Sequence, residues 1–562
     1  MVGMMRRSIL AAATGVLVAA ALIQPAAAAD PSTDGYSIDG NSGTDGTGGV
    51  AWAPCPQYSD EVLAHLGLRE EDYPKFRQLW ARTECGTVQV PLDYKNPRGQ
   101  KITVAITRLK ARDRKHRQGV LSMNPGGPGG SGYMMPQEMY LRGGEDGLAA
   151  RLNERYDLIG FDPRGVGYST SYDCPDNGPG GPGGGPITEA VARQAYEELK
   201  AANKACSESN PSFLRQLTTT NVARDLDRVR AALGERKMNF FGVSWGTWLG
   251  VQYRNEFPER VANMWVDSTA IPEMRLDVFG ATRSKATYDD FTRMAQWLAE
   301  RDAEYGFGDT RDEVIAAIAA LKADYDAHPR NFVEIPEPLD GFVIGISGTQ
   351  PAPVWPVASR VLRDLRDVTG EHAPPSLLEV WGGGGGPQGP PPAGMPRMNN
   401  RTMNQAVMCN EDMGSRDFET SWAAYQKRLV DEPVTGFLSM PIPGCAGWTL
   451  DPQPVRLRHS NASLVMSGHR YEAVSPYQWT PAMRAEVGGS IVSVNDDVHG
   501  SAAMTADCSA LIASYFERGR LSGRTCEGEG PLPREDSVES FSVGQSFSEG
   551  QSFVEGRSFS LR

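Results

Sequence analysis

The segment from Met238 to Gly250 constrains the fold of this chain more than any other stretch. An apolar run ending at Gly242 is short enough to be a buried strand, and it leads into the pattern G-x-S-x-G over residues 242–246. A helix-compatible segment, Thr247 to Phe257, follows directly. In this arrangement, called a nucleophile elbow, a serine occupies a strained strand-to-helix turn, and small residues two positions to either side avoid steric clashes. We refer to residues 242–246 as the elbow. We therefore expect the hydroxyl of Ser244 to stand clear of a buried sheet.

The pentapeptide alone is weak evidence, because it fixes three positions in a chain that has 62 glycines among 562 residues. Its surroundings make it more specific, since β-rich runs lie before and after it and helical stretches, Thr188–Cys206 and Asn221–Leu233, lie between them. The runs are Gly86–Val90, Ile102–Ile106, Val120–Met123, Tyr156–Phe161, Val261–Val266, Ser463–Met466 and Ser490–Val494. This order predicts an α/β fold with a mostly parallel, doubly wound sheet.

A glycine-rich loop follows the third of these runs. Gly127, Gly129 and Gly132 match G-x-G-x-x-G, which is also the pattern of dinucleotide-binding loops. Pro125 and Pro128 remove N–H groups that a pyrophosphate would need, and no acidic residue ends a strand about 20 residues later. A glycine-rich loop after an early strand is instead where α/β-hydrolases place one N–H group of the oxyanion hole.

The character of the sequence changes between about residue 270 and residue 440. Helical patterns cover Thr287–Glu304, Arg311–His328 and Val357–Val368, and residues Trp381–Pro396 are mostly glycine and proline. We interpret residues 276–440 as a mainly helical cap inserted into the α/β core, with a glycine-rich loop of its own. The two parts of the core are then residues 51–275 and 441–528.

Both ends of the chain have the composition of segments outside the core. Arg6-Arg7, an apolar run from Ser8 to Ile23 and Ala27-Ala28-Ala29 are typical of a signal peptide, residues 1–29, cleaved after Ala29. We therefore expect an extracellular protein without stable membrane insertion, because the apolar run is short for a membrane span of ~20 residues. Residues 30–50 are predicted to be a flexible leader, and residues 529–562, with Ser-Phe pairs every six residues, a disordered tail.

Eight cysteines remain in the predicted exported chain, an even number that favours disulfides in an oxidising compartment. No C-x-x-C spacing is present and no histidines cluster near them, so a zinc site is not expected. The cysteines form four couples that are local in sequence. We predict the pairs Cys55–Cys85, Cys174–Cys206, Cys409–Cys445 and Cys508–Cys526.

The net charge of the chain is −13, and no basic cluster is interleaved with aromatic residues. Nucleic acid is therefore not an expected partner. The oligomeric state is left open by the sequence.

A serine nucleophile needs a base and an acid, and in α/β-hydrolases these follow the serine in the order acid, then histidine. His499 follows the last strand-like run and has the expected position for the base, whereas His459 and His469 come too early. Glu472, just after the preceding run, is the favoured acid. Asp267, at the end of the strand after the elbow, is the rival acid.

Taken together, the motifs resemble those of the secreted bacterial tripeptidyl aminopeptidases, which belong to the prolyl-iminopeptidase-like branch of the α/β-hydrolases. The resemblance runs from about Cys55 to Cys526 and rests on the segments Pro125–Gly132, Asp162–Gly167, Gly242–Gly246 and those around Glu472 and His499. It implies a catalytic triad and an oxyanion hole. The triad residues are Ser244, Glu472 and His499, and the oxyanion N–H groups are those of Gly127 and Trp245. The family usually has Asp where this chain has Glu472.

We therefore expect a secreted serine exopeptidase that needs no cofactor and releases short peptides, tripeptides in particular, from free N-termini through an acyl-enzyme. A secreted esterase or lipase-like hydrolase is the alternative enzyme, and a catalytically inactive binding protein is the alternative of another class. The segment Ala406–Asp412 resembles the Cys-x-acid segment of the family. It makes Glu411 first, and Asp412 second, the candidate for pairing with the substrate's ammonium group.

Overall fold

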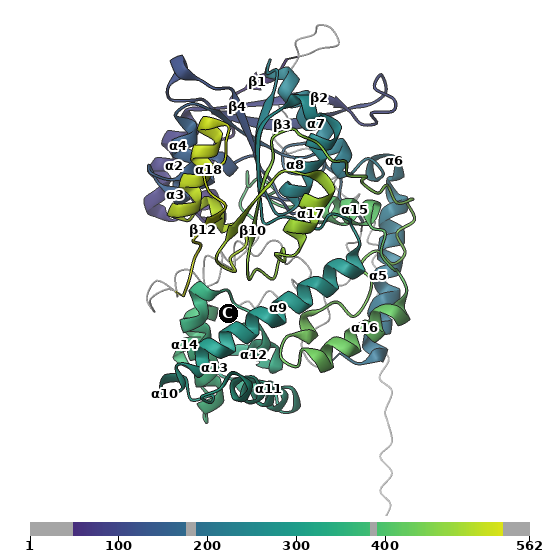
Figure 1. Ribbon diagram of the computed structural model, residues 1–562. Helices are drawn as coiled ribbons and strands as arrows, with labels where there is room; N and C mark the ends of the chain where they lie inside the picture. Colours follow the sequence, from purple (N-terminus) through teal and green to yellow (C-terminus); the bar gives the residue numbers. More distant parts are fainter. Residues whose placement is uncertain (1–48, 176–186, 383–390, 532–562) are drawn as a thin grey trace, which may run out of the picture. The chain divides into compact units, whose positions relative to one another are not determined.

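The computed structural model describes residues 49–175, 187–382 and 391–531 (Figure 1). The predicted signal peptide, nearly all of the leader and of the C-terminal tail, and much of the glycine-rich loop of the cap lie outside these ranges. Within them, no helix combines the length and apolar character that crossing a membrane requires.

Ten strands form one sheet in the order β1-β2-β3-β5-β4-β6-β7-β10-β11-β12. They are β1 (Ala51–Ala53), β2 (Thr83–Pro91), β3 (Lys101–Leu109), β4 (Val120–Asn124), β5 (Asp157–Phe161), β6 (Met238–Val243), β7 (Val261–Asp267), β10 (Val465–His469), β11 (Ser490–Val494) and β12 (Thr525–Cys526). The first four strands in this order pair antiparallel and the rest pair parallel. This confirms the predicted α/β class with a mostly parallel sheet. The short strands β1 and β12 were not predicted.

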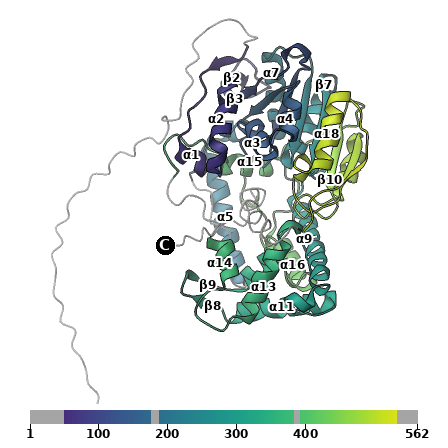
Figure 2. The same ribbon diagram turned by 90° about the vertical axis from the view of Figure 1, so that its left-hand side faces the viewer.

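Helices cover both faces of the sheet, which explains why its central strands are continuous apolar runs (Figures 1 and 2). Phe240 packs into the cluster on one face and its neighbour Phe241 into the cluster on the other, because side chains alternate along a strand. The first face carries α7 (Thr219–Ala232), α8 (Trp245–Glu256), α15 (Arg401–Glu411) and α17 (Trp479–Val487). The second carries α2 (Tyr73–Ala81), α3 (Met135–Gly143), α4 (Leu148–Asn153) and α18 (Ala506–Arg518).

The predicted insertion contains a group of helices with its own hydrophobic core. These are α9 (Leu276–Ala299), α10 (Asp302–Tyr305), α11 (Arg311–Ala327), α12 (Gly341–Ser347), α13 (Trp355–Asp367) and α14 (Pro375–Gly382), with a hairpin of β8 (Arg330–Phe332) and β9 (Ile335–Leu339). A further helix of the predicted insertion, α16 (Phe418–Asp431), packs around Phe418 against α5 (Glu189–Ser209), which precedes the insertion in the chain. By contrast α15, although inside the predicted insertion, packs into a cluster of the main sheet.

Helix α9 starts eleven residues before the predicted start at Thr287. Few side chains in its first turns are fully buried. The sequence there therefore does not need the apolar periodicity that marks the later turns, and the start of the helix was not predicted. The helix also ends earlier than expected, at Ala299, and a separate short helix, α10, follows.

All four predicted disulfides are present, with Cα atoms 5.0 to 5.3 Å apart. Among the described residues no cysteine is free. Cys409–Cys445 ties α15 to the segment that leads back toward the sheet.

Candidate active site

Ser244 lies between β6 and α8 with φ 59° and ψ −125°, a conformation that a residue with a Cβ rarely adopts. The flanking glycines are required by close packing. A Cβ on Gly242 would come within 2.4 Å of the carbonyl oxygen of Gly246, and a Cβ on Gly246 within 2.7 Å of that of Asn124. Ser244 N donates to the carbonyl oxygen of Asp267 at 3.0 Å. The predicted strand–turn–helix is thus present, with a half-buried serine at its apex.

The glycine-rich loop lies directly against this serine. A Cβ on Gly126 would approach the carbonyl oxygen of Val243 to 2.6 Å and the Cβ of Ser244 to 2.8 Å. The N–H groups of Gly127 and Trp245, the predicted oxyanion donors, find no acceptor among the described residues. Both are therefore free to donate to a ligand at the serine.

Residues 398–404, which follow helices α9–α14 within the predicted insertion, hold the other side of this loop. Ser131 N donates to the carbonyl oxygen of Met398 at 2.7 Å, and Asn400 N donates to that of Gly129 at 2.9 Å. The side-chain amide of Asn404 donates to the carbonyl oxygen of Pro128 at 2.8 Å. The glycine-rich loop is thus fixed between the elbow and residues 398–404.

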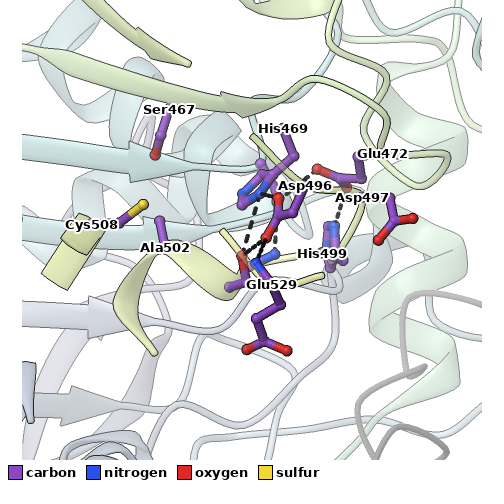
Figure 3. A network of polar contacts seen from close by, with 12 residues as sticks. Ser467, His469, Glu472, Asp496, Asp497, His499, Ala502, Cys508 and Glu529 are labelled. Atoms are coloured by element: carbon purple, nitrogen blue, oxygen red, sulfur yellow. Dashed lines mark hydrogen bonds and ion pairs between the residues drawn. The ribbon is translucent and has the colours of Figure 1, made fainter. Parts of the chain in front are cut away.

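The structure brings Glu472, and not Asp267, to the imidazole of His499. His499 Nδ1 and Glu472 Oε1 form a hydrogen bond in which the imidazole donates to the carboxylate (Figure 3). Glu472 is 1% exposed, and its oxygens also accept from Ser475 N at 2.7 Å and from Ser268 Oγ at 3.0 Å. This fixes the orientation of the carboxylate that faces His499.

The loop that carries His499 also contacts the elbow. A Cβ on Gly500 would lie 2.8 Å from Cγ1 of Val243, the residue that precedes Ser244. Gly500 N donates to Ser268 Oγ at 2.8 Å. Ser244, the hydrogen-bonded pair Glu472–His499 and the glycine-rich loop therefore gather at the carboxyl ends of neighbouring strands.

Sequence reasoning missed Ser268, which follows Asp267 at the end of β7. Its φ is 52°, and among the described residues it and Ser244 are the two non-glycine residues with positive φ. In this conformation its hydroxyl both donates to Glu472 and accepts from Gly500 N. Backbone strain of this kind is found where a site requires it, but no local sequence pattern announces it.

His469, set aside from the sequence because it precedes the acid, is fully buried at the end of β10 (Figure 3). Its Nδ1 lies 2.5 Å from Asp496 Oδ1 and its Nε2 lies 3.0 Å from Asp267 Oδ1. Burial alone would lower the pKa of His469, but the two carboxylates raise it well above its ordinary value. Asp267, the rival acid, is thus paired with the protonated His469 and not with His499.

Comparison with known proteins adds the family. Residues 119–312 match the model of the alpha/beta hydrolase fold, and residues 434–526 match that of the TAP-like proteins. The tripeptidyl aminopeptidase of Streptomyces lividans is 30% identical over 486 residues, which cover 82% of this chain and 87% of that protein. The chain belongs to the tripeptidyl aminopeptidase family. It is a serine peptidase with an α/β-hydrolase fold.

Two other relatives match shorter parts of the peptidase. Serine protease Hip1 of Mycobacterium tuberculosis is 37% identical over 229 residues, 40% of each chain. Carboxylesterase B of the same species is 36% identical over 163 residues, 26% of this chain and 28% of that protein.

The two acids predicted to bind the substrate's amine make contacts inside the peptidase. Glu411 is 1% exposed, and it accepts from Thr219 N at 2.5 Å, from Thr219 Oγ1 at 3.0 Å and from Trp248 Nε1 at 3.1 Å. Asp412 Oδ1 accepts from Leu276 N at 2.9 Å and Gly414 N at 2.7 Å. The structure thus gives each acid a role in holding helices, and their role as amine anchors stays a prediction.

Replacing Ser268 with Gly or with Ala should lower kcat/KM by roughly 10-fold, because a hydrogen bond to a charged group is worth about 1.5–3 kcal/mol. Both variants lose the hydroxyl, whereas only Gly favours the positive φ. Steady-state kinetics on a tripeptide p-nitroanilide would measure the loss. Full activity of the Gly variant would show that the hydroxyl does not help to position Glu472.

Glu411 makes stability depend on pH. Burial raises the pKa of its carboxyl from 4.5 to about 7, so the folded state binds more protons than the unfolded state between these values. Stability therefore falls as pH rises through this window, by on the order of 3 kcal/mol in total. We expect the Tm of Glu411→Gln, relative to wild type, to be higher at pH 8 than at pH 5.

The matched control is Glu419→Gln, which makes the same change at an exposed position on α16. Its Tm difference from wild type should be the same at both pH values. An equal difference at both pH values for Glu411→Gln would contradict the assigned protonation of the buried carboxyl.

Proposed function

We propose that Ser244, Glu472 and His499 form the catalytic triad of a secreted peptidase that releases tripeptides from free N-termini. The observation that carries this proposal is the buried carboxylate of Glu472, hydrogen-bonded to His499 on a loop that contacts the elbow of Ser244. The homology to tripeptidyl aminopeptidases supports the class of substrate. The predicted signal peptide and the four disulfides support an oxidising, extracellular location.

The reaction follows from the chemistry of these groups. His499 accepts the proton of Ser244 Oγ as the oxygen attacks the carbonyl carbon of the scissile peptide bond. Glu472 holds the imidazole in the tautomer that can accept this proton and stabilises the imidazolium that forms. The proton then passes to the leaving amine, and an acyl-enzyme remains on Ser244. Water, deprotonated by His499, releases the tripeptide and restores the serine.

The negative charge of the tetrahedral intermediates develops on the former carbonyl oxygen. The N–H groups of Gly127 and Trp245 are the proposed donors to that oxygen, since both lie beside the serine without an acceptor among the described residues. Such donors, fixed in advance, stabilise the oxyanion without reorganisation during the reaction. The side chain of Trp245 plays no part in this, because the donor is the backbone.

An esterase activity is the second candidate, and the likeness of part of the chain to carboxylesterase B favours it. Ester and peptide hydrolysis use the same triad, so the geometry of the site does not separate them. Comparing kcat/KM on tripeptide p-nitroanilides with that on p-nitrophenyl esters does. The proposal requires efficient cleavage of the anilides.

Glu472→Gln should lower kcat by roughly 10⁴-fold, because replacing a triad acid by its amide favours the wrong imidazole tautomer. Labelling with a fluorophosphonate probe should modify Ser244 in the wild type and be much slower in the variant. Glu486→Gln, the same change at an exposed position on α17, should leave both rates unchanged. Unreactive Ser244 in fully oxidised wild-type protein would refute the triad.

Recognition of the free amine predicts a preference that acetylation removes. Wild type should cleave a tripeptide p-nitroanilide with a free N-terminus far faster than its N-acetylated form. If Glu411 anchors the ammonium group, Glu411→Gln should abolish much of this preference, with Asp412→Asn next in effect. An unchanged preference in Glu411→Gln excludes it as the anchor, and equal cleavage of both substrates by wild type excludes an aminopeptidase.

A further inference from the structure

Helix α9 is attached to the catalytic side of the sheet at two places along one of its faces. Near its start, the ring of Phe279 stacks on that of Trp479, with centroids 5.2 Å apart. About four turns later, Arg293 lies 3.7 Å from the ring centroid of Tyr471 and forms an ion pair with Asp497 at 3.1 Å. Tyr471 directly precedes Glu472, and Asp497 lies two residues before His499. This face of α9 therefore contacts the two loops that carry the proposed acid and base.

Arg283 lies on the same face, between these two attachments. Residues 279, 283, 286, 290 and 293 are spaced by four and three, which places them in one row along a helix. The guanidinium of Arg283 is held 5.1 Å from the ring centroid of Phe279. Arg283 therefore lies between the contact of α9 with Trp479 and its contacts with Tyr471 and Asp497.

Arg283 is the unpaired cation of this helix. Lys285 binds Asp289, and Arg293 binds Asp290 and Asp497. The guanidinium of Arg283, although half-buried, makes neither a hydrogen bond nor an ion pair to any residue that the structure describes. A partly desolvated charge without a hydrogen-bond or ion-pair partner is costly, and such a group is typical of a binding site.

The negative charge of Glu472 acts on the guanidinium of Arg283. Burial lowers the pKa of its guanidinium to about 10, and the negative charge of Glu472 opposes this shift. The group stays protonated at neutral pH. Glu472 forms no ion pair with Arg283, and its oxygens accept instead from His499, Ser475 and Ser268.

We propose that Arg283 binds a carboxylate of the peptide substrate, an inference that rests on the proposed peptidase site. A planar guanidinium matches a carboxylate through two parallel hydrogen bonds, and it repels the ammonium group at the other end of the peptide. The carboxylate is either an acidic side chain on the acyl side of the scissile bond or the C-terminus of a short leaving peptide. Arg283 thus makes the enzyme selective for an anionic group at one of these positions.

Two substrate pairs distinguish these sources. The first compares Ala-Ala-Glu with Ala-Ala-Gln p-nitroanilide, and the second compares Ala-Ala-Ala-Ala with its C-terminal amide. Each pair differs by one negative charge, so general effects of a variant on the triad cancel in the ratio of kcat/KM values. In one pair, Arg283→Gln should reduce the ratio of kcat/KM for the substrate with the extra negative charge to that for its neutral counterpart by roughly 10- to 100-fold. This is the loss expected when hydrogen bonds to a charged group are removed.

Arg283→Lys should lose less, because it keeps the charge but not the fork of donors. Lys285→Gln, at an exposed position of the same helix, should leave both ratios unchanged. Unchanged ratios in both pairs for an active Arg283→Gln would overturn the inference and leave the proposed peptidase intact. Failure of wild type to cleave any of the four substrates would instead refute the proposed function, and this inference with it.

Discussion

A protonated histidine between two buried carboxylates organises the catalytic end of this sheet. His469 ends β10, Asp267 ends β7 and Asp496 follows β11, so the imidazolium joins three neighbouring parallel strands at one edge. Because the folded-state pKa of His469 is raised, its contribution to stability is fully present below its unfolded pKa and is lost only as pH rises through the folded value. Without this cation, two carboxylates would be buried with no counter-charge.

The proposed acid and base, and the serine that positions the acid, are placed by this cluster. Ser268 is the next residue after Asp267, Glu472 is three residues after His469, and His499 is three residues after Asp496. Each is thus carried by a short stretch of backbone whose starting point is fixed by a buried ion pair. The position of His499 therefore depends on the ion pairs of His469 with Asp496 and Asp267, none of which includes the His499 imidazole.

The sequence predicts those parts of the site that a local pattern encodes. The elbow of Ser244, the glycine-rich loop and the parallel strands follow from residue type and spacing, and the disulfides from couples local in sequence. The choice between Glu472 and Asp267 stayed open, because both follow a strand and only the tertiary structure shows which one faces His499. Ser268 and His469 were missed for the same reason: the partners that give them a role lie about 200 residues away in the sequence. The start of α9, which carries Arg283, has few buried side chains and no apolar period that would reveal a helix.

The backbone pairing between the glycine-rich loop and residues 398–404 has a consequence for how such enzymes diversify. Residues 398–404, which lie inside the predicted insertion, hold the loop that carries Gly127, a proposed oxyanion donor, so the insertion and the proposed reaction chemistry share a boundary in the backbone. A shortened hydrolase made by deleting residues 276–440 would lose the support of its glycine-rich loop along with its helices. An insertion exchanged between relatives must therefore keep the hydrogen bonds between residues 398–404 and the glycine-rich loop. This requirement limits how far an insertion that changes substrate selectivity can evolve without affecting catalysis.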